Sequence, residues 1–173
     1  MPSFKEQYER VKRYLKRIQS EEQSTTDYMD DLYSYFVNCY HLKDWIKNDP
    51  STGLSHREVE NFVNSKLSLQ ICADLANRTK HLVLAEHIRK DAEITNRSVT
   101  IDLGKGKTIH ENIITLQDGS KHVAENIAQQ ALDDWTQFIS TKKLIWLACA
   151  YGLTRPPLCR SKETPLDIYR IIA

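Results

Sequence analysis

The chain has 173 residues, 27% of them charged, and a formal net charge of +1. This length fits a single domain that buries enough surface to need no disulfide or metal as a staple. A net charge near zero neither favours nor excludes nucleic acid, because only local charge clusters bear on that question. The four cysteines form no Cys-x-x-Cys pair, and the first residues show no signal-peptide pattern. The longest apolar run, 144–153, is too short to cross a bilayer. We therefore expect a reduced, cytoplasmic protein that has no membrane partner.

Four helices are predicted in the first half of the chain. Apolar residues over 4–18 step by three and four, which is typical of an amphipathic helix. A second helix is predicted over about 26–48, and because it is apolar on most sides we expect it at the centre of a bundle. Ser55 and Glu58 have the spacing of a capping box and predict the start of a third helix. A fourth helix is predicted over about 67–89.

The pattern changes in the second half. Alternating apolar residues predict a small β-hairpin at about 98–116, and Asp118 and Gly119 predict a second turn. Apolar residues over 123–139 then predict a last long helix. We expect His110 and His122, which flank these turns, to be surface residues.

These elements predict a mainly α protein, a helical bundle of five or six helices with a small β-hairpin insertion before the last long helix. The expected helical domain covers 1–140. The tail, 141–173, is expected to pack on that domain or on a partner, and its apolar stretch is a candidate subunit contact.

Polar residues gather on the second and fourth predicted helices. His41 and Asp44 lie together on the second, away from its main apolar stripe. On the fourth, Asp74, Asn77 and His81 follow the spacing i, i+3, i+7 and share one stripe, because a helix turns about 100° per residue. Arg78 stands four residues after Asp74, as an intrahelical ion pair requires. If the two helices pack side by side, these imidazoles and carboxylates converge.

Three interpretations remain open for this constellation. The first is a structural clamp in which His41 pairs with Asp44, Asp74 pairs with Arg78, and Asn77 bonds across the helices, because buried polar groups must be paired. The second is a metal site, but neither helix carries the Glu-x-x-His pair of di-iron bundles. We therefore predict no metal and no cofactor.

The third interpretation is an acid–base site that cleaves RNA without a metal. His41 and His81 would exchange protons, Asp44 would orient His41, and Lys80 or Arg78 would hold a phosphate, with Asn77 in the same candidate site. Asp74 and Arg78 would then contribute to binding.

The motif His-Leu-x-Asp-Trp, which begins at His41, and the motif Asp-x-x-Asn-x-x-Lys-His, which begins at Asp74, resemble a group of uncharacterised bacterial and phage-borne proteins. This resemblance spans about 28–84, and more loosely the hairpin, the second turn and Trp135. The helix pattern is also similar to the HEPN superfamily. That similarity implies a compact and often dimeric bundle, of a kind common in toxin–antitoxin and anti-phage systems and in several metal-independent RNases.

The HEPN nucleases carry an Arg, four to six further residues, and then a His. In this chain two residues separate Arg78 from His81 and eight separate it from His87, and no other pair fits. The nuclease activity is therefore not carried over. Our preferred hypothesis is a non-enzymatic helical module of a mobile-element or defence-related system with a structural clamp. The alternative is a metal-independent RNase.

Partners remain open at this point: a second copy of the chain, an RNA, or another protein. The first helix is basic, with six Lys or Arg against two Glu over residues 5–17. Such a face either follows a phosphate backbone or is simply solvated.

Overall fold

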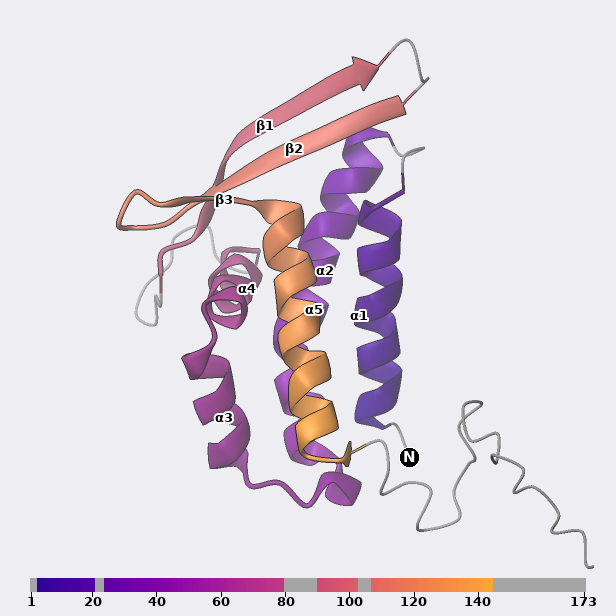
Figure 1. Ribbon diagram of the computed structural model, residues 1–173, viewed down its shortest axis with the longest axis vertical. Coiled ribbons are helices and arrows are strands. Elements are labelled where there is room, and N and C mark those ends of the chain that lie inside the picture. The colour runs from indigo at the N-terminus through magenta and orange to yellow at the C-terminus, as the bar shows by residue number, and fades with distance from the viewer. Residues whose placement is uncertain (1–2, 21–23, 80–89, 103–106, 145–173) are drawn as a thin grey trace, which may run out of the picture.

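Helices dominate the part of the chain that the structure describes, and one small antiparallel sheet precedes the last of them (Figure 1). The computed structural model describes residues 3–20, 24–79, 90–102 and 107–144. The elements found there are α1 (Phe4–Ile18), α2 (Thr25–Asn48), the short 3-10 helix η1 (Pro50–Thr52), α3 (His56–Ser65), α4 (Leu67–Arg78), β1 (Glu93–Asp102), β2 (Lys107–Thr115), β3 (Lys121–Val123) and α5 (Ala124–Thr141). The predicted fold class is confirmed.

Side-chain caps mark the starts of α1, α2 and α3. Ser24 accepts a hydrogen bond from the Asp27 amide at the start of α2, at 3.1 Å. The predicted capping box opens α3: the Glu58 amide donates to Ser55 Oγ, and Glu58 Oε2 accepts from the Ser55 amide at 3.0 Å. Such caps satisfy amides that the first helical turn leaves unpaired. Gly53 ends η1 with φ of 62°, a left-handed conformation that glycine adopts without strain.

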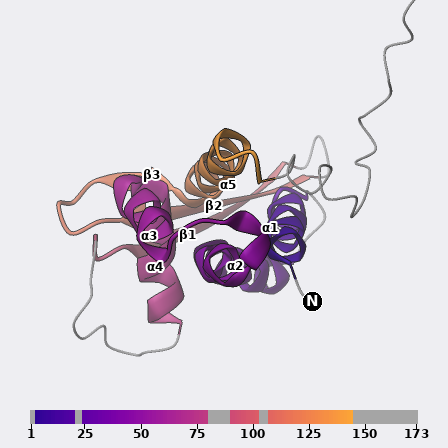
Figure 2. The same cartoon turned by 90° about the horizontal axis from the view of Figure 1, so that it is seen from below.

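Helix α2 lies at the centre of the bundle, as its apolar circumference predicts. Figures 1 and 2 show α1 and α5 beside it, with α3 and α4 on the remaining side. Helix α1 runs antiparallel to α2, because the amide of Phe4 at its start donates to Asp49 at the end of α2, at 3.1 Å. Helices α2 and α5 begin at the same end of the bundle, where the Tyr28 hydroxyl donates to Glu125 at 2.9 Å.

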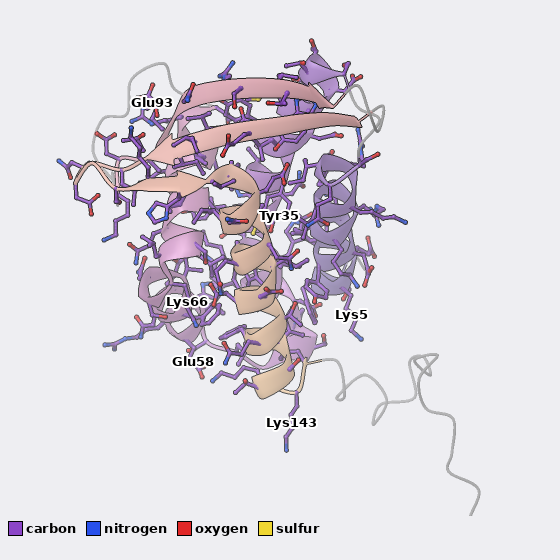
Figure 3. The ribbon with its side chains drawn as sticks, turned by 45° about the horizontal axis from the view of Figure 1, so that its top comes forward. Lys5, Tyr35, Glu58, Lys66, Glu93 and Lys143 are labelled. Atoms are coloured by element: carbon purple, nitrogen blue, oxygen red, sulfur yellow. The ribbon has the colours of Figure 1, made fainter. Side chains whose placement is uncertain are left out.

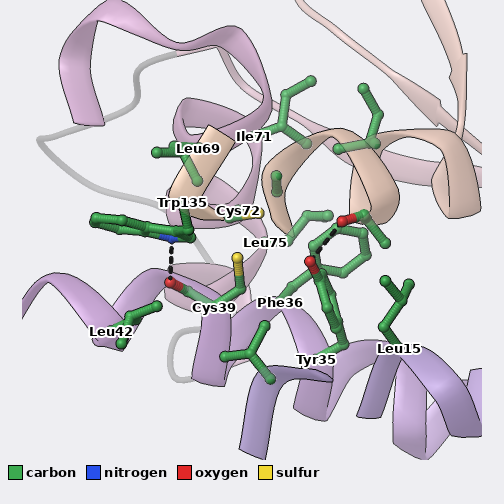
Figure 4. Close-up of a cluster of buried hydrophobic side chains, with 14 of the residues drawn as sticks. Leu15, Tyr35, Phe36, Cys39, Leu42, Leu69, Ile71, Cys72, Leu75 and Trp135 are labelled. Carbon is green, nitrogen blue, oxygen red and sulfur yellow. Dashed lines mark hydrogen bonds between the residues drawn. The ribbon is translucent and has the colours of Figure 1, made fainter. Parts of the chain in front are cut away.

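Trp135 of α5 is central to the core: Figure 4 shows it among buried side chains of α2 and α4, and its ring also contacts Phe62 of α3. This side chain is completely buried, and its indole N–H donates to the Cys39 carbonyl oxygen of α2 at 3.1 Å. Its ring centroid lies 5.4 Å from that of Phe62 in α3 and 5.8 Å from that of Phe138 in α5. One aromatic side chain therefore joins three helices.

The sheet has the strand order β1-β2-β3, and all its pairs are antiparallel. In Figure 1 the long β1–β2 hairpin lies across the end of the bundle where α2 and α5 begin. Ile94 of β1 and Ile114 of β2 are buried, as is Leu116 directly after β2. The predicted span of 98–116 began too late, since β1 starts at Glu93. A bulge between Ile94 and Asn96 breaks the alternation on which the prediction relied.

The predicted second turn is present, and Gly119 adopts a φ of 81° in it. It leads into the short strand β3, which occupies residues 121–123, ahead of the predicted last helix. That helix, α5, begins at Ala124 and ends at Thr141.

His110 is a correction to the sequence prediction. It is buried, and its ring stacks on Tyr28 with 4.4 Å between centroids. The strand period explains this position, because residues 110, 112 and 114 all face the helices on which the hairpin rests. His122 is half-buried, and its Nε2 lies 3.4 Å from Ser120 Oγ.

Three expectations fall wholly or partly outside the described residues: the continuation of the fourth helix to 89, the tip of the hairpin, and the tail beyond 144. Within the residues that are described, no helix is long and apolar enough to cross a membrane.

Candidate functional site

His41 and Asp44 form the pair that their spacing on α2 predicts. His41 Nδ1 lies 3.2 Å from Asp44 Oδ2, and about one third of each side chain is exposed. A carboxylate that holds one ring nitrogen of a histidine fixes the orientation of that ring. The pair stands on the flank of α2, near α3.

Two lysines and a second carboxylate extend this pair into a charge cluster. Asp44 Oδ1 lies 3.2 Å from Lys43 Nζ and 2.8 Å from Lys47 Nζ. The same two ammonium groups lie 2.8 and 2.7 Å from Glu60 Oε1 on α3. Lys43 is itself buried. Charges of both signs alternate here, so the cluster ties α2 to α3 through paired groups. We call these five residues, His41, Lys43, Asp44, Lys47 and Glu60, the α2–α3 charge cluster.

The cluster shifts the pKa of its acids downward. Partial burial by itself raises the pKa of Asp44, but hydrogen bonds from Lys47, His41 and Lys43 outweigh it and lower that pKa to about 2. Burial acts in the same direction on Glu60, and its bonds to the two lysines again bring the net pKa below its usual value. Burial lowers the pKa of Lys47, but its two carboxylate partners outweigh this and raise it.

The charge cluster should make the stability of the fold depend on pH in the acidic range. A carboxyl whose folded pKa is depressed stabilises the fold above its unfolded pKa, about 4, and loses that contribution as the pH falls through the folded value. We expect the melting temperature of the native chain to fall between pH about 4 and pH about 2. In the double variant Asp44→Asn/Glu60→Gln this fall should be smaller.

The measurement is thermal denaturation followed by circular dichroism across that pH range. Glu111→Gln makes the same chemical change at an exposed position of β2 and serves as the control. If the melting temperature of the double variant fell with pH as steeply as that of the Glu111→Gln control, the acid dependence would not come from the charge cluster.

Asp74 lies on the other helix and has a different environment. Its residue exposure is 1%. Its Oδ2 accepts the backbone amide of Lys90 at 2.7 Å and that of Ala92 at 3.4 Å. A buried carboxylate satisfied by two amides fixes the backbone that supplies them. Asp74 thus connects α4 to the segment that enters β1.

Arg78 bonds to the same segment. Its Nε donates to the Ala92 carbonyl oxygen at 2.9 Å, and its guanidinium forms an ion pair with Asp91. The prediction paired Asp74 with Arg78 along the helix; the structure gives both of them partners in residues 90–92. Asp91 has a φ of 51°, which is uncommon for a residue other than glycine. The two side chains of α4 therefore hold a backbone turn in an unusual conformation.

The remaining predicted residues are Asn77, Lys80 and His81. Asn77 is half-buried in the last turn of α4. Lys80 and His81 lie outside the described residues. Helices α2 and α4 pack directly on each other, as the clamp and the active-site interpretations both require. The two carboxylates nevertheless bond to different partners: Asp44 to the charge cluster on α2 and α3, Asp74 to the approach to β1.

Several polar groups escaped the prediction. Glu60 was missed because it bonds across helices, and Asp91 because it follows the predicted end of the fourth helix. Asp134 of α5 was also missed: it is buried, accepts from Ser68 Oγ at 2.5 Å, and pairs with Lys66 at 3.0 Å. Figure 3 shows Lys66 and Glu58 on the α3 side of α5. The signal that the sequence offered for Asp134 was an acidic residue on the apolar stripe of the last predicted helix.

Nothing in the described part of the chain groups three or more His, Cys, Asp or Glu side chains as a metal site requires. Comparisons of the chain with protein-family models, with curated proteins and with solved structures gave no significant match.

Proposed function

We propose that this chain is a non-enzymatic helical module that acts by contact with a partner macromolecule, and that its polar residues on α2 and α4 are structural. The environment of Asp74 carries the proposal. Its buried carboxylate binds two backbone amides of its own chain, at 2.7 and 3.4 Å. In the RNase alternative Asp74 would contribute to binding instead, and for that its carboxylate would have to reach the substrate. Asp74 is placed to hold α4 against the entry to β1.

The α2–α3 charge cluster supports the same proposal. Lys43 and Lys47 each contact both Asp44 and Glu60. Ammonium groups paired in this way connect α2 to α3 and offer little charge to a phosphate. The resemblance to bacterial and phage-borne proteins adds the proposal of a mobile-element or defence-related system. RNA, another protein and a second copy of the chain are the partners to be tested.

One observation favours the alternative, a metal-independent RNase. The His41 ring is about one third exposed, and Asp44 holds its Nδ1 at 3.2 Å. A carboxylate orients a catalytic imidazole in this way. In that alternative His41 and His81 form the acid–base pair, Asp44 orients His41, Lys80 steadies the phosphate, and Asn77 belongs to the same site.

An RNA cleavage assay tests the two functions against each other. The purified chain is incubated with mixed RNA at neutral pH, with and without Mg²⁺, Mn²⁺ or Zn²⁺, at concentrations where its oligomeric state has been measured. We expect no cleavage above that of the double variant His41→Ala/His81→Ala. The reason is that, in this proposal, the polar side chains of α2 and α4 have structural roles. Cleavage by the native chain that disappears in the double variant would establish the RNase instead.

A further inference from the structure

The second half of α1 presents positive charge only. Its charged residues after Glu9 are all basic: Arg10, Lys12, Arg13, Lys16 and Arg17. The acidic residues of this helix, Glu6 and Glu9, stand in its first half. The buried stripe of α1 faces the core, and these basic residues cover the opposite side. The near-zero net charge of the chain therefore conceals a local cationic surface.

The three arginines of α1 share one flank of this helix. Arg10, Arg13 and Arg17, with Tyr14 among them, line a surface hollow of about 200 Å³. Their spacing, i, i+3, i+4 and i+7, aligns them along roughly 10 Å of helix at a rise of about 1.5 Å per residue. We call these four residues the arginine row.

Neighbouring side chains hold two of the guanidinium groups in place. Arg10 donates to Gln7 Oε1 at 2.7 Å, and its guanidinium carbon lies 5.8 Å from the centre of the Trp45 ring. Arg17 contacts both carboxylate oxygens of Asp31, at 2.9 and 2.6 Å, and lies 5.3 Å from the Tyr14 ring. Planar groups held in this way lose less freedom on binding than mobile lysines.

The charge of the row is only partly neutralised. Asp31 balances Arg17. Arg10 has a neutral partner, and among the described residues Arg13 has neither an ion pair nor a side-chain hydrogen bond to another residue. The arginine row therefore keeps two uncompensated positive charges beside two aromatic rings, Tyr14 and Trp45.

We propose that the arginine row binds the phosphate backbone of a single-stranded nucleic acid. Guanidinium groups match phosphate oxygens with two parallel hydrogen bonds. Aromatic rings beside a cationic groove supply planes for unpaired bases, which is how strands are held without sequence readout. The hollow is short and lies along a helix flank, which suits one strand better than a duplex. This inference rests on the proposed function, because it names the partner of the module.

Fluorescence anisotropy tests the arginine row. The probe is a labelled mixed-sequence RNA of about 16 nucleotides, measured at about 50 mM and about 200 mM salt. The variant Arg10→Gln/Arg13→Gln leaves the Arg17–Asp31 pair intact. Lys12→Gln/Lys16→Gln removes the same charge from α1 outside the hollow and is the matched control. Circular dichroism melts show whether both variants fold like the native chain.

We expect the native chain to bind this RNA, and the arginine variant to bind about tenfold more weakly at low salt, with the slope of log affinity against log salt reduced by about 1.4. The lysine control should lose much less. Equal losses of RNA affinity in both variants would show that the arginine row is not a specific site, because they would indicate a diffuse attraction of RNA to the positive charge of α1. Absence of RNA binding by the native chain would also overturn it.

Two further binding experiments distinguish a nucleic acid from an acidic protein as the partner. The first uses polyglutamate of matched charge. If the chain bound it as tightly as the RNA, the partner would be an acidic protein and the proposal would be wrong. Tyr14→Leu should weaken RNA binding and leave polyglutamate binding unchanged, since only bases stack. Cleavage of RNA would contradict the proposed non-enzymatic module but not RNA binding by the arginine row. Lack of RNA binding would contradict the arginine row as a site but not the structural role of Asp74.

Discussion

Replacement of Trp135 by Ala should lower the free energy of unfolding by about 3–5 kcal/mol. The side chain is completely buried where α2, α3 and α5 meet. Its removal leaves a cavity beside Phe62 and Phe138, which both contact its ring. The measurement is chemical denaturation monitored by circular dichroism.

Trp135→Phe is the matched control. It keeps an aromatic ring in the core and loses the N–H that donates to the Cys39 carbonyl oxygen, so we expect a loss of only about 1–2 kcal/mol. If Trp135→Ala were no more destabilising than Trp135→Phe, the contact among the three helices would not depend on this ring.

The helices could be predicted because their signals are local. The capping box at Ser55 and the three-and-four steps of α1 are properties of neighbouring residues, and the structure confirms both. The start of β1 was missed for the opposite reason. The bulge after Ile94 depends on pairing with β2, about twenty residues away, and sequence alternation cannot report it. The burial of His110 depends in the same way on the packing of the hairpin over Tyr28.

The candidate site was predictable only within each helix. His41 and Asp44 pair as their spacing predicts. The partners of Asp74 and Arg78 lie in residues 90–92, beyond the predicted helix, and backbone amides leave no mark in a sequence. The contact of Asp44 with Lys43 and Lys47 is local, but Glu60 enters only because α3 folds back onto α2.

Replacement of Asp74 by Ala should cost about 3 kcal/mol of stability, because it removes the acceptor of two backbone donors, one part-buried and one buried. Asp74→Asn retains an acceptor oxygen in the same place, and we expect a loss of about 1 kcal/mol. Chemical denaturation measures both changes. Amide hydrogen exchange gives a local readout: the amides of Lys90 and Ala92 should exchange faster in Asp74→Ala than in the native chain.

The sign of the stability change separates the two functions. A carboxylate kept for chemistry commonly destabilises its own protein, and its removal then leaves stability unchanged or raises it. A structural carboxylate behaves in the opposite way, since its loss strands the amides that it held. Should Asp74→Ala be as stable as the native chain, with unchanged exchange at Lys90 and Ala92, the structural role would be wrong and the acid–base alternative would gain. A clear loss of stability together with faster exchange at those two amides would place Asp74 in the framework, where it fixes the entry to β1 and therefore the hairpin that covers the bundle.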